Sequence, residues 1–211
     1  MEHLRVRRDF GEAPEAREVF YRVSYLGYRD ELLGEMVEEY KYRSIRGLAG
    51  VLAEILWEGY LRSETRKRKV ILVPFPTSRK HIRERGMDHT LILAREIAKR
   101  AGGGMEVSRM LRRRKDTTQV GASEELRKKQ AKEATEVDER EVRRVLEKYG
   151  RALEKGKARV VVFDDVWTTG ASMIEAGKKL RRAGVERLEG LTVVRGRRQK
   201  SPTIYGGLFE A

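Results

Sequence analysis

The chain has 211 residues, which suits one domain of ordinary size, and 39% of them are hydrophobic while 38% are charged. It contains no cysteine, which excludes disulfide bonds and thiolate-bound zinc. The sequence has no apolar run of roughly 18 residues and no start like a signal peptide, so we expect a cytoplasmic protein with no membrane partner. The formal net charge of +14 favours anionic partners, from phosphorylated metabolites to nucleic acid.

The first half of the chain predicts a strand, two helices, a second strand and a third helix. Apolar and polar residues roughly alternate over 19–26, as in a strand, and apolar residues recur at helical spacing over 32–40 and again over 45–56. The run Val70–Val73 is wholly apolar, as expected of a strand covered on both faces, and prolines follow it. A helix is predicted over 90–100.

A basic region separates this half from the next predicted helix. The stretch 109–132 is polar with little apolar periodicity, which predicts a long mobile loop. Asp138 and Glu141 then form a capping-box-like start for a helix.

The last elements complete a pattern of alternating strands and helices. Val160–Phe163 is another buried-strand run, Ser172 is expected to cap a helix that runs to Arg182, and 188–194 predicts a final strand. The alternation predicts an α/β fold with a mostly parallel central sheet flanked by helices. We expect a single domain with an N-terminal helical or hood segment over about 1–66, a core over about 67–195 and a tail over 196–211.

The stretch 160–172 combines a buried strand with two acids, two threonines and a glycine before a helix. In an open α/β sheet, ligands bind at such a strand end beside a helix N-terminus. Backbone N–H groups and the helix dipole favour a phosphate there, and Gly170 allows its close approach. The two acids would repel this anion unless they bind another group, and sugar hydroxyls or a magnesium ion are the expected partners. The alternative is a plain strand–turn–helix with surface acids.

This stretch resembles the signature by which type I phosphoribosyltransferases bind phosphoribosyl pyrophosphate (PRPP), in which four apolar residues and two acids precede Thr-Thr-Gly-Ala-Ser. The resemblance implies the type I phosphoribosyltransferase fold, with Asp164 and Asp165 as catalytic acids that hold the ribose hydroxyls. It also implies Mg2+ as a cofactor, bound mainly through PRPP and not by protein ligands. The 5-phosphate would lie against the turn formed by Thr168, Thr169, Gly170, Ala171 and Ser172.

Two further segments, 73–79 and 83–87, resemble the ComF/GntX-type amidophosphoribosyltransferase-like family. That family has Pro-x-Pro at a strand end and Arg-Gly about ten residues on, and 39–42 is similar to its Leu-Lys-Tyr stretch. The resemblance implies that Thr77, Ser78 and Arg79 bind the pyrophosphate; an ordinary proline-stopped turn is the alternative. Where the family usually has Asn-Gln, this chain has Asp88-His89.

The cations of the basic loop and the histidines have competing interpretations. By analogy with the family, Arg113 and Lys115 belong to a mobile loop that closes over the site and stabilises departing pyrophosphate. An ordinary solvated basic surface explains these cations equally well. We interpret His81 and His89 as surface residues on a turn and at a helix start rather than as acid–base groups.

These expectations combine into one function and one alternative. The resemblance implies an enzyme that transfers the 5-phosphoribosyl group of PRPP to a small-molecule nitrogen nucleophile, with a nucleobase as the expected acceptor, and releases pyrophosphate. The alternative is a non-catalytic protein on the same fold that senses PRPP or binds nucleic acid, because the net charge alone predicts weak nucleic-acid binding. Whether the chain forms a homodimer stays open.

Overall fold

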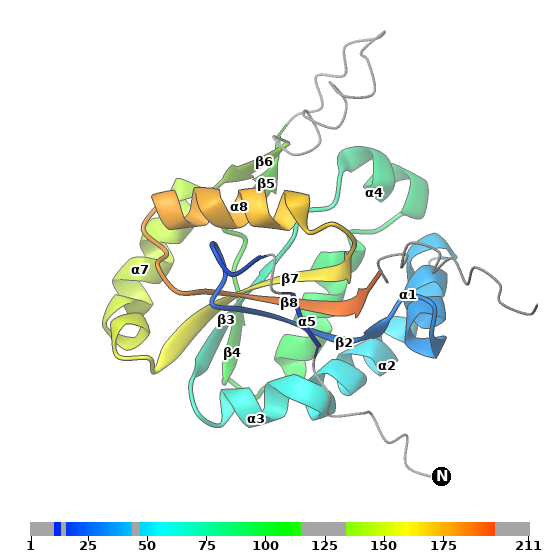
Figure 1. Ribbon diagram of the computed structural model, residues 1–211, viewed down its shortest axis with the longest axis horizontal. Helices are drawn as coiled ribbons and strands as arrows, with labels where there is room; N and C mark the ends of the chain where they lie inside the picture. Colours follow the sequence, from blue (N-terminus) through cyan, green and yellow to red (C-terminus); the bar gives the residue numbers. More distant parts are fainter. Residues whose placement is uncertain (1–10, 14–15, 44–46, 115–133, 197–211) are drawn as a thin grey trace, which may run out of the picture.

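A computed structural model describes residues 11–13, 16–43, 47–114 and 134–196 and has a central β-sheet with helices on both faces (Figure 1). The sheet has the strand order β1-β2-β8-β7-β3-β4. Its strands are β1 (Gly11–Glu12), β2 (Arg22–Tyr28), β3 (Lys69–Pro74), β4 (Met105–Val107), β7 (Ala158–Trp167) and β8 (Leu188–Arg195). All neighbouring strands pair in parallel except β1 with β2, so the predicted α/β fold with a mostly parallel sheet is confirmed.

The helices divide between the two faces and bury one hydrophobic cluster on each. The helices α7 (Glu139–Glu154) and α8 (Ala171–Arg182) cover one face, where they pack against Val160 and Val162. The other face carries α1 (Leu32–Tyr42), α2 (Gly47–Leu56) and α5 (His89–Arg100), which pack against Val161 and Phe163. The π-helical turn η2 (Trp57–Leu61) and α3 (Arg62–Thr65) continue α2. Successive β7 side chains therefore face opposite layers, as a buried parallel strand requires.

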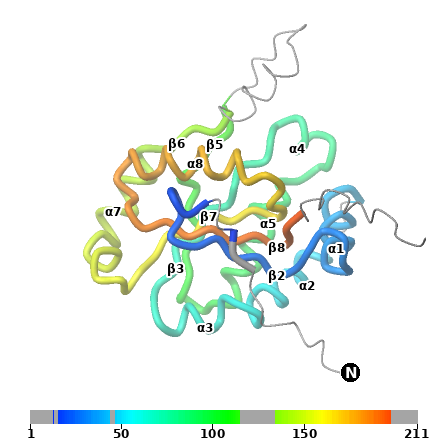
Figure 2. The backbone as a smooth tube through the Cα atoms, in the orientation of Figure 1, coloured from blue at the N-terminus to red at the C-terminus, as the bar shows by residue number. Residues whose placement is uncertain are grey.

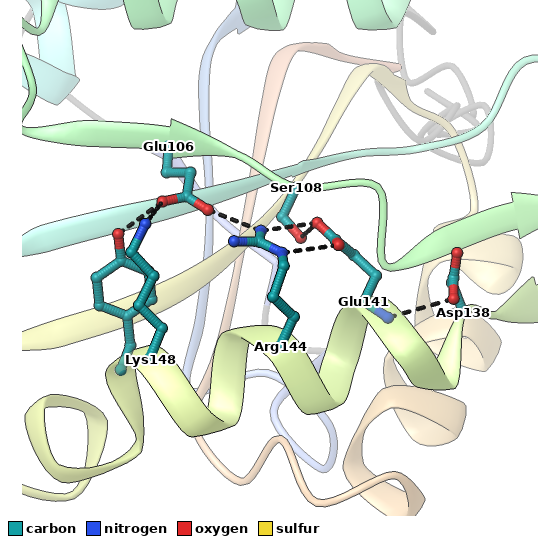
Figure 3. A network of polar contacts seen from close by, with 7 residues as sticks. Glu106, Ser108, Asp138, Glu141, Arg144 and Lys148 are labelled. Carbon is teal, nitrogen blue, oxygen red and sulfur yellow. Dashed lines mark hydrogen bonds and ion pairs between the residues drawn. The ribbon is translucent and has the colours of Figure 1, made fainter.

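The helix α7 is held to the edge strand β4 by a network of charges (Figure 3). Glu106 of β4 accepts hydrogen bonds from Arg144 and Lys148 at 2.7 and 2.9 Å, and from the Tyr149 hydroxyl at 2.6 Å. Arg144 also donates to Glu141, which in turn accepts a hydrogen bond from Ser108 Oγ at 2.9 Å. The amphipathic helix thus contacts the sheet through polar as well as apolar side chains.

The predicted start of the mobile loop is corrected. Residues 111–113 form strand β5 (Leu111–Arg113), which pairs antiparallel with β6 (Thr135–Val137) beside α8 (Figure 2). The stretch therefore begins as a strand, because Leu111 is buried in the core and Lys179 of α8 donates to the Thr135 carbonyl at 2.7 Å. Residues 115–133, including the predicted loop residue Lys115, lie outside the described part of the chain, as do 1–10, 14–15, 44–46 and 197–211.

The boundaries around 160–172 are corrected as well. Strand β7 does not end before the two acids but continues to Trp167, because Asp164, Val166 and Trp167 still pair with β8. Ser172 does not cap the next helix. Gly170 takes the N-cap position of α8 in a left-handed conformation with φ 71°, and Ser172 is already the second residue of the helix.

Two more differences lie at the start of the chain and after β3. Strand β2 begins at Arg22 and pairs with β8, so part of the segment that we assigned to a hood belongs to the central sheet. The turn after β3 continues into the short helix α4 (Arg79–Arg85), which the sequence did not predict. In the described part of the chain, no helix is both long enough and apolar enough to span a membrane.

Candidate functional site

The order of the strands creates a point where ligands bind in this class of sheet. From β3 the chain moves outward to β4, whereas from β7 it moves in the opposite direction to β8. The carboxyl ends of β3 and β7 are therefore adjacent at a topological switch point, where open α/β sheets bind ligands. Pairing between the two strands stops at Pro74 and Phe163, so Asp164 and Asp165 extend past the end of β3.

A pocket of about 360 Å³ lies at this switch point. Six of the predicted site residues line it: Thr77, Ser78, Arg113, Asp164, Asp165 and Thr168. The structure thus brings together the two acids, part of the phosphate turn and part of the turn after β3. Of the other predicted site residues that it describes, Arg79, Thr169, Gly170, Ala171 and Ser172 are not among the residues that line the pocket. The pocket is also lined by side chains that we did not predict as site residues, among them Glu38, Lys41, Arg85 and His89.

The carboxylate of Asp165 is held by two side chains from different helices. Lys41 of α1 donates to Oδ1 at 3.0 Å, and His89 Nε2 lies 2.7 Å from Oδ2. Asp165 is 3% exposed. Burial alone would raise the pKa of this carboxyl, but the hydrogen bond from His89 and the charge of Lys41 outweigh it and lower the pKa below its usual range. Asp165 is therefore a buried anion at the wall of the pocket.

Asp164 has a different environment from its neighbour. It is half-buried, and one carboxyl oxygen accepts a hydrogen bond from the Asp165 backbone N–H at 2.9 Å. Burial and the adjacent negative charge of Asp165 raise the pKa of Asp164 well above its usual range. The two adjacent acids thus differ in their tendency to ionise.

His89 is buried, so our interpretation of it as a surface residue was wrong. His81 is exposed as expected, but it lies in helix α4 rather than on a turn, and it also lines the pocket. Arg85 lies 3.3 Å from His89 Nδ1, and a guanidinium group can only donate, which favours a ring proton on Nε2, the nitrogen 2.7 Å from Asp165. The Tyr40 hydroxyl donates to the His89 carbonyl at 2.7 Å. His89 is buried because these contacts connect α5 to both α1 and β7.

The turn between β7 and α8 depends on a contact between Gly170 and Trp167. A Cβ atom at Gly170 would lie 2.0 Å from the Trp167 ring, and the positive φ also favours glycine. Trp167 is 1% exposed and belongs to the core. The Ala171 N–H donates to Thr169 Oγ1 at 3.4 Å, a long hydrogen bond. The first turn of α8 contains no acidic residue, and because glycine is the N-cap residue, no N-cap side chain accepts a hydrogen bond from the helix N-terminus.

The turn after β3 is fixed by hydrogen bonds to the helices that follow it. Thr77 Oγ1 donates to Asp88 Oδ1 at 2.9 Å, and Asp88 also caps α5 by accepting from the Leu91 N–H. Ser78 caps α4 by accepting from the His81 N–H at 3.1 Å. Arg79 is the exposed first residue of α4. Thr77 and Ser78 therefore have structural partners in addition to their place at the pocket.

The residues that sequence reasoning missed were partly visible in the sequence. Lys41 lies in the stretch 39–42 that resembles the family, and His89 lies in the Asp88-His89 pair that departs from it. Neither feature indicated contact with Asp165. In the part of the chain that the structure describes, no group of three or more His, Cys, Asp or Glu side chains could hold a metal ion. A magnesium ion in this pocket would take most of its ligands from phosphate oxygens and water.

Comparison of the sequence with protein-family models gives no match, and comparison with curated proteins gives none.

Proposed function

We propose that the chain binds PRPP together with magnesium on a type I phosphoribosyltransferase-like fold, and transfers the 5-phosphoribosyl group to a nitrogen nucleophile such as a nucleobase. The observation that carries this proposal is the pocket at the switch point between β3 and β7. There, the acids of β7, Thr168 and the turn after β3 all border the same space.

The start of α8 supports a phosphate beside the two acids. The first N–H groups of a helix have no partner within the helix, and its dipole attracts negative charge. Gly170 forms the turn in front of this helix, and the first helical turn contains no carboxylate that would repel the phosphate. Thr168 is exposed at the pocket and adds a hydroxyl donor.

The proposed reaction exchanges one bond at C1 of the ribose. The bond from C1 to the acceptor nitrogen forms as the bond from C1 to pyrophosphate oxygen breaks; pyrophosphate leaves with the electron pair, and the acceptor proton passes to pyrophosphate or water. The protein contributes mainly by orienting groups and stabilising charge. Asp164 orients the ribose hydroxyls, Thr77 and Ser78 border the pyrophosphate, and Arg113 offsets its negative charge. Magnesium, when bound, neutralises pyrophosphate charge.

The direct test is a panel of nucleobases incubated with PRPP and magnesium, read by release of pyrophosphate. We expect release with at least one base, and loss of at least 100-fold in kcat/KM for Asp164→Asn, because an oriented contact made at the reacting sugar contributes several kcal/mol. Glu186→Gln, an exposed acid outside the pocket, is the control and should keep the wild-type rate. Release that is unchanged in Asp164→Asn would contradict the assigned site.

A second candidate is a protein on this fold that binds PRPP or nucleic acid without catalysis. The net charge of +14 favours this candidate, since the 47 lysines and arginines outnumber the 33 acidic residues and attract polyanions. PRPP binding without pyrophosphate release across the whole panel would support this candidate.

A further inference from the structure

The two adjacent acids of β7 belong to different layers of the molecule. Neighbouring residues of a strand point to opposite faces. Asp165 lies on the face covered by α1 and α5, where Lys41 and His89 contact both of its carboxylate oxygens. Asp164 points to the opposite side and is half-buried at the pocket.

The contacts around Asp165 leave little of it for a ligand. Its side chain is 5% exposed, and that of Lys41 is 15% exposed. A buried charge is stable only with a partner, and removal of one member of a buried pair leaves the other without compensation. The pair is therefore needed to keep the end of β7 against α1.

We propose that Lys41 and His89 are positioning residues, which hold Asp165 as a buried anion and leave Asp164 as the acid that meets the ligand. The identity of that ligand as PRPP rests on the proposed function, whereas the anchoring of Asp165 does not. His89 contacts Asp165 through Nε2, which lies 2.7 Å from Oδ2, whereas Arg85 lies on the Nδ1 side of the ring. Three elements, α1, α5 and β7, are joined by this one carboxylate.

The anchoring is tested first without any ligand, by a double-mutant cycle on thermal unfolding. We expect Lys41→Met to lower Tm by about 5 to 10 °C, because it removes the lysine partner of a buried carboxylate. Adding Asp165→Asn should recover at least half of this loss. Lys41→Arg retains the charge and should lose less than Lys41→Met. Lys99→Met removes an exposed ion pair and serves as the control, with Tm within about 2 °C of wild type.

The role of Asp164 is tested by the Kd for PRPP with magnesium, measured by calorimetry on the same variants. We expect Asp164→Asn to weaken binding about 10- to 100-fold. Asp165→Asn should weaken binding in the wild-type background but not further in Lys41→Met, because both changes release the same strand end. An acid that contacts the ligand directly would cost the same factor in both backgrounds.

Each outcome decides a separate point. If the Tm losses of Lys41→Met and Asp165→Asn simply add in the double variant, Lys41 does not anchor Asp165. The division of roles is overturned if the Tm losses are coupled but Asp165→Asn weakens PRPP binding by the same factor in the wild-type and Lys41→Met backgrounds. That result would show that Asp165 contacts the ligand itself. If wild type binds no PRPP, the proposed function and the role of Asp164 fall together, while the Tm cycle still decides whether Lys41 anchors Asp165.

Discussion

Among single residues, Trp167 packs directly against Gly170 in the proposed phosphate turn. Its ring fills the space in which a Gly170 side chain would lie, so a change at the turn alters the surroundings of the indole. The indole itself is in the core at the end of β7 and is not among the residues that line the pocket.

Fluorescence of Trp167 should therefore report on ligand binding indirectly. The Trp57→Phe variant keeps Trp167 as the remaining indole of the chain. We expect its emission to change on titration with PRPP and magnesium, because a phosphate at the α8 N-terminus restrains the turn that packs on the ring. Adenosine, which lacks a phosphate, is the control ligand and should leave the emission unchanged. A flat titration up to millimolar PRPP would contradict a phosphate site at this turn.

The sequence predicted the residues of the pocket that are neighbours along the chain. The acids, Thr168 and the turn after β3 could be found because each follows a run of buried apolar residues. Lys41 could not, since its contact with Asp165 joins residues 124 positions apart. His89 was interpreted as exposed because a polar residue at a helix start usually is, and no local pattern indicates that a carboxylate from another strand covers it.

At the scale of elements, the attachment of α7 to β4 depends on the charge of Glu106. Burial alone would raise the pKa of this carboxyl, but hydrogen bonds from Tyr149, Lys148 and Arg144 outweigh it and lower the pKa to about 2 (Figure 3). Its usual value is 4.5, so the ionised form stabilises the folded state above pH 4.5, and this contribution is lost as the pH falls toward 2.

Glu106→Gln should consequently lower Tm at pH 7 by about 2 to 4 °C, an effect kept small because Arg144 and Lys148 are largely exposed to water. Between pH 4.5 and 2 the difference from wild type should shrink, since the wild-type carboxylate takes up a proton there. Thermal unfolding across this pH range measures both effects. Glu147→Gln, an exposed acid of the same helix, is the control; a difference that grows on acidification would refute the stabilising role of the charge.

Elements with strong periodicity were predicted well, and those set by distant contacts were not. The helices α5 and α7 and the strands β3 and β8 lie within a few residues of their predicted positions. Strand β5 has three residues and is stabilised by pairing with β6, more than twenty residues later, which no local pattern reveals. Helix α4 has one apolar residue, Ile82, among its seven, so no amphipathic stripe indicated it.

For the molecule as a whole, the charge of +14 predicts some affinity for nucleic acid of any sequence. If the charge mainly suits phosphorylated substrates, single-stranded and duplex oligonucleotides should bind weakly at about 150 mM salt, and their affinity should fall steeply as salt rises. Electrophoretic or anisotropy titrations across salt concentrations measure this. Poly-glutamate, an anionic polymer without bases, is the control and should compete at similar charge concentration.

Tight binding at that salt would change the conclusion. Sub-micromolar affinity for an oligonucleotide, combined with no pyrophosphate release from any nucleobase, would favour the non-catalytic candidate. PRPP should then alter the oligonucleotide affinity through a coupled site, and by the same factor in the reverse direction.

The place of β8 between β2 and β7 has a consequence for how the chain folds during synthesis. Strand β2 emerges early from the ribosome, yet its parallel neighbour emerges more than 150 residues later. Until then β2 cannot join the rest of the sheet, because loop closure over so many residues must come first. The central sheet is therefore joined only by its last strand, although every residue that lines the pocket precedes Leu188 in the chain.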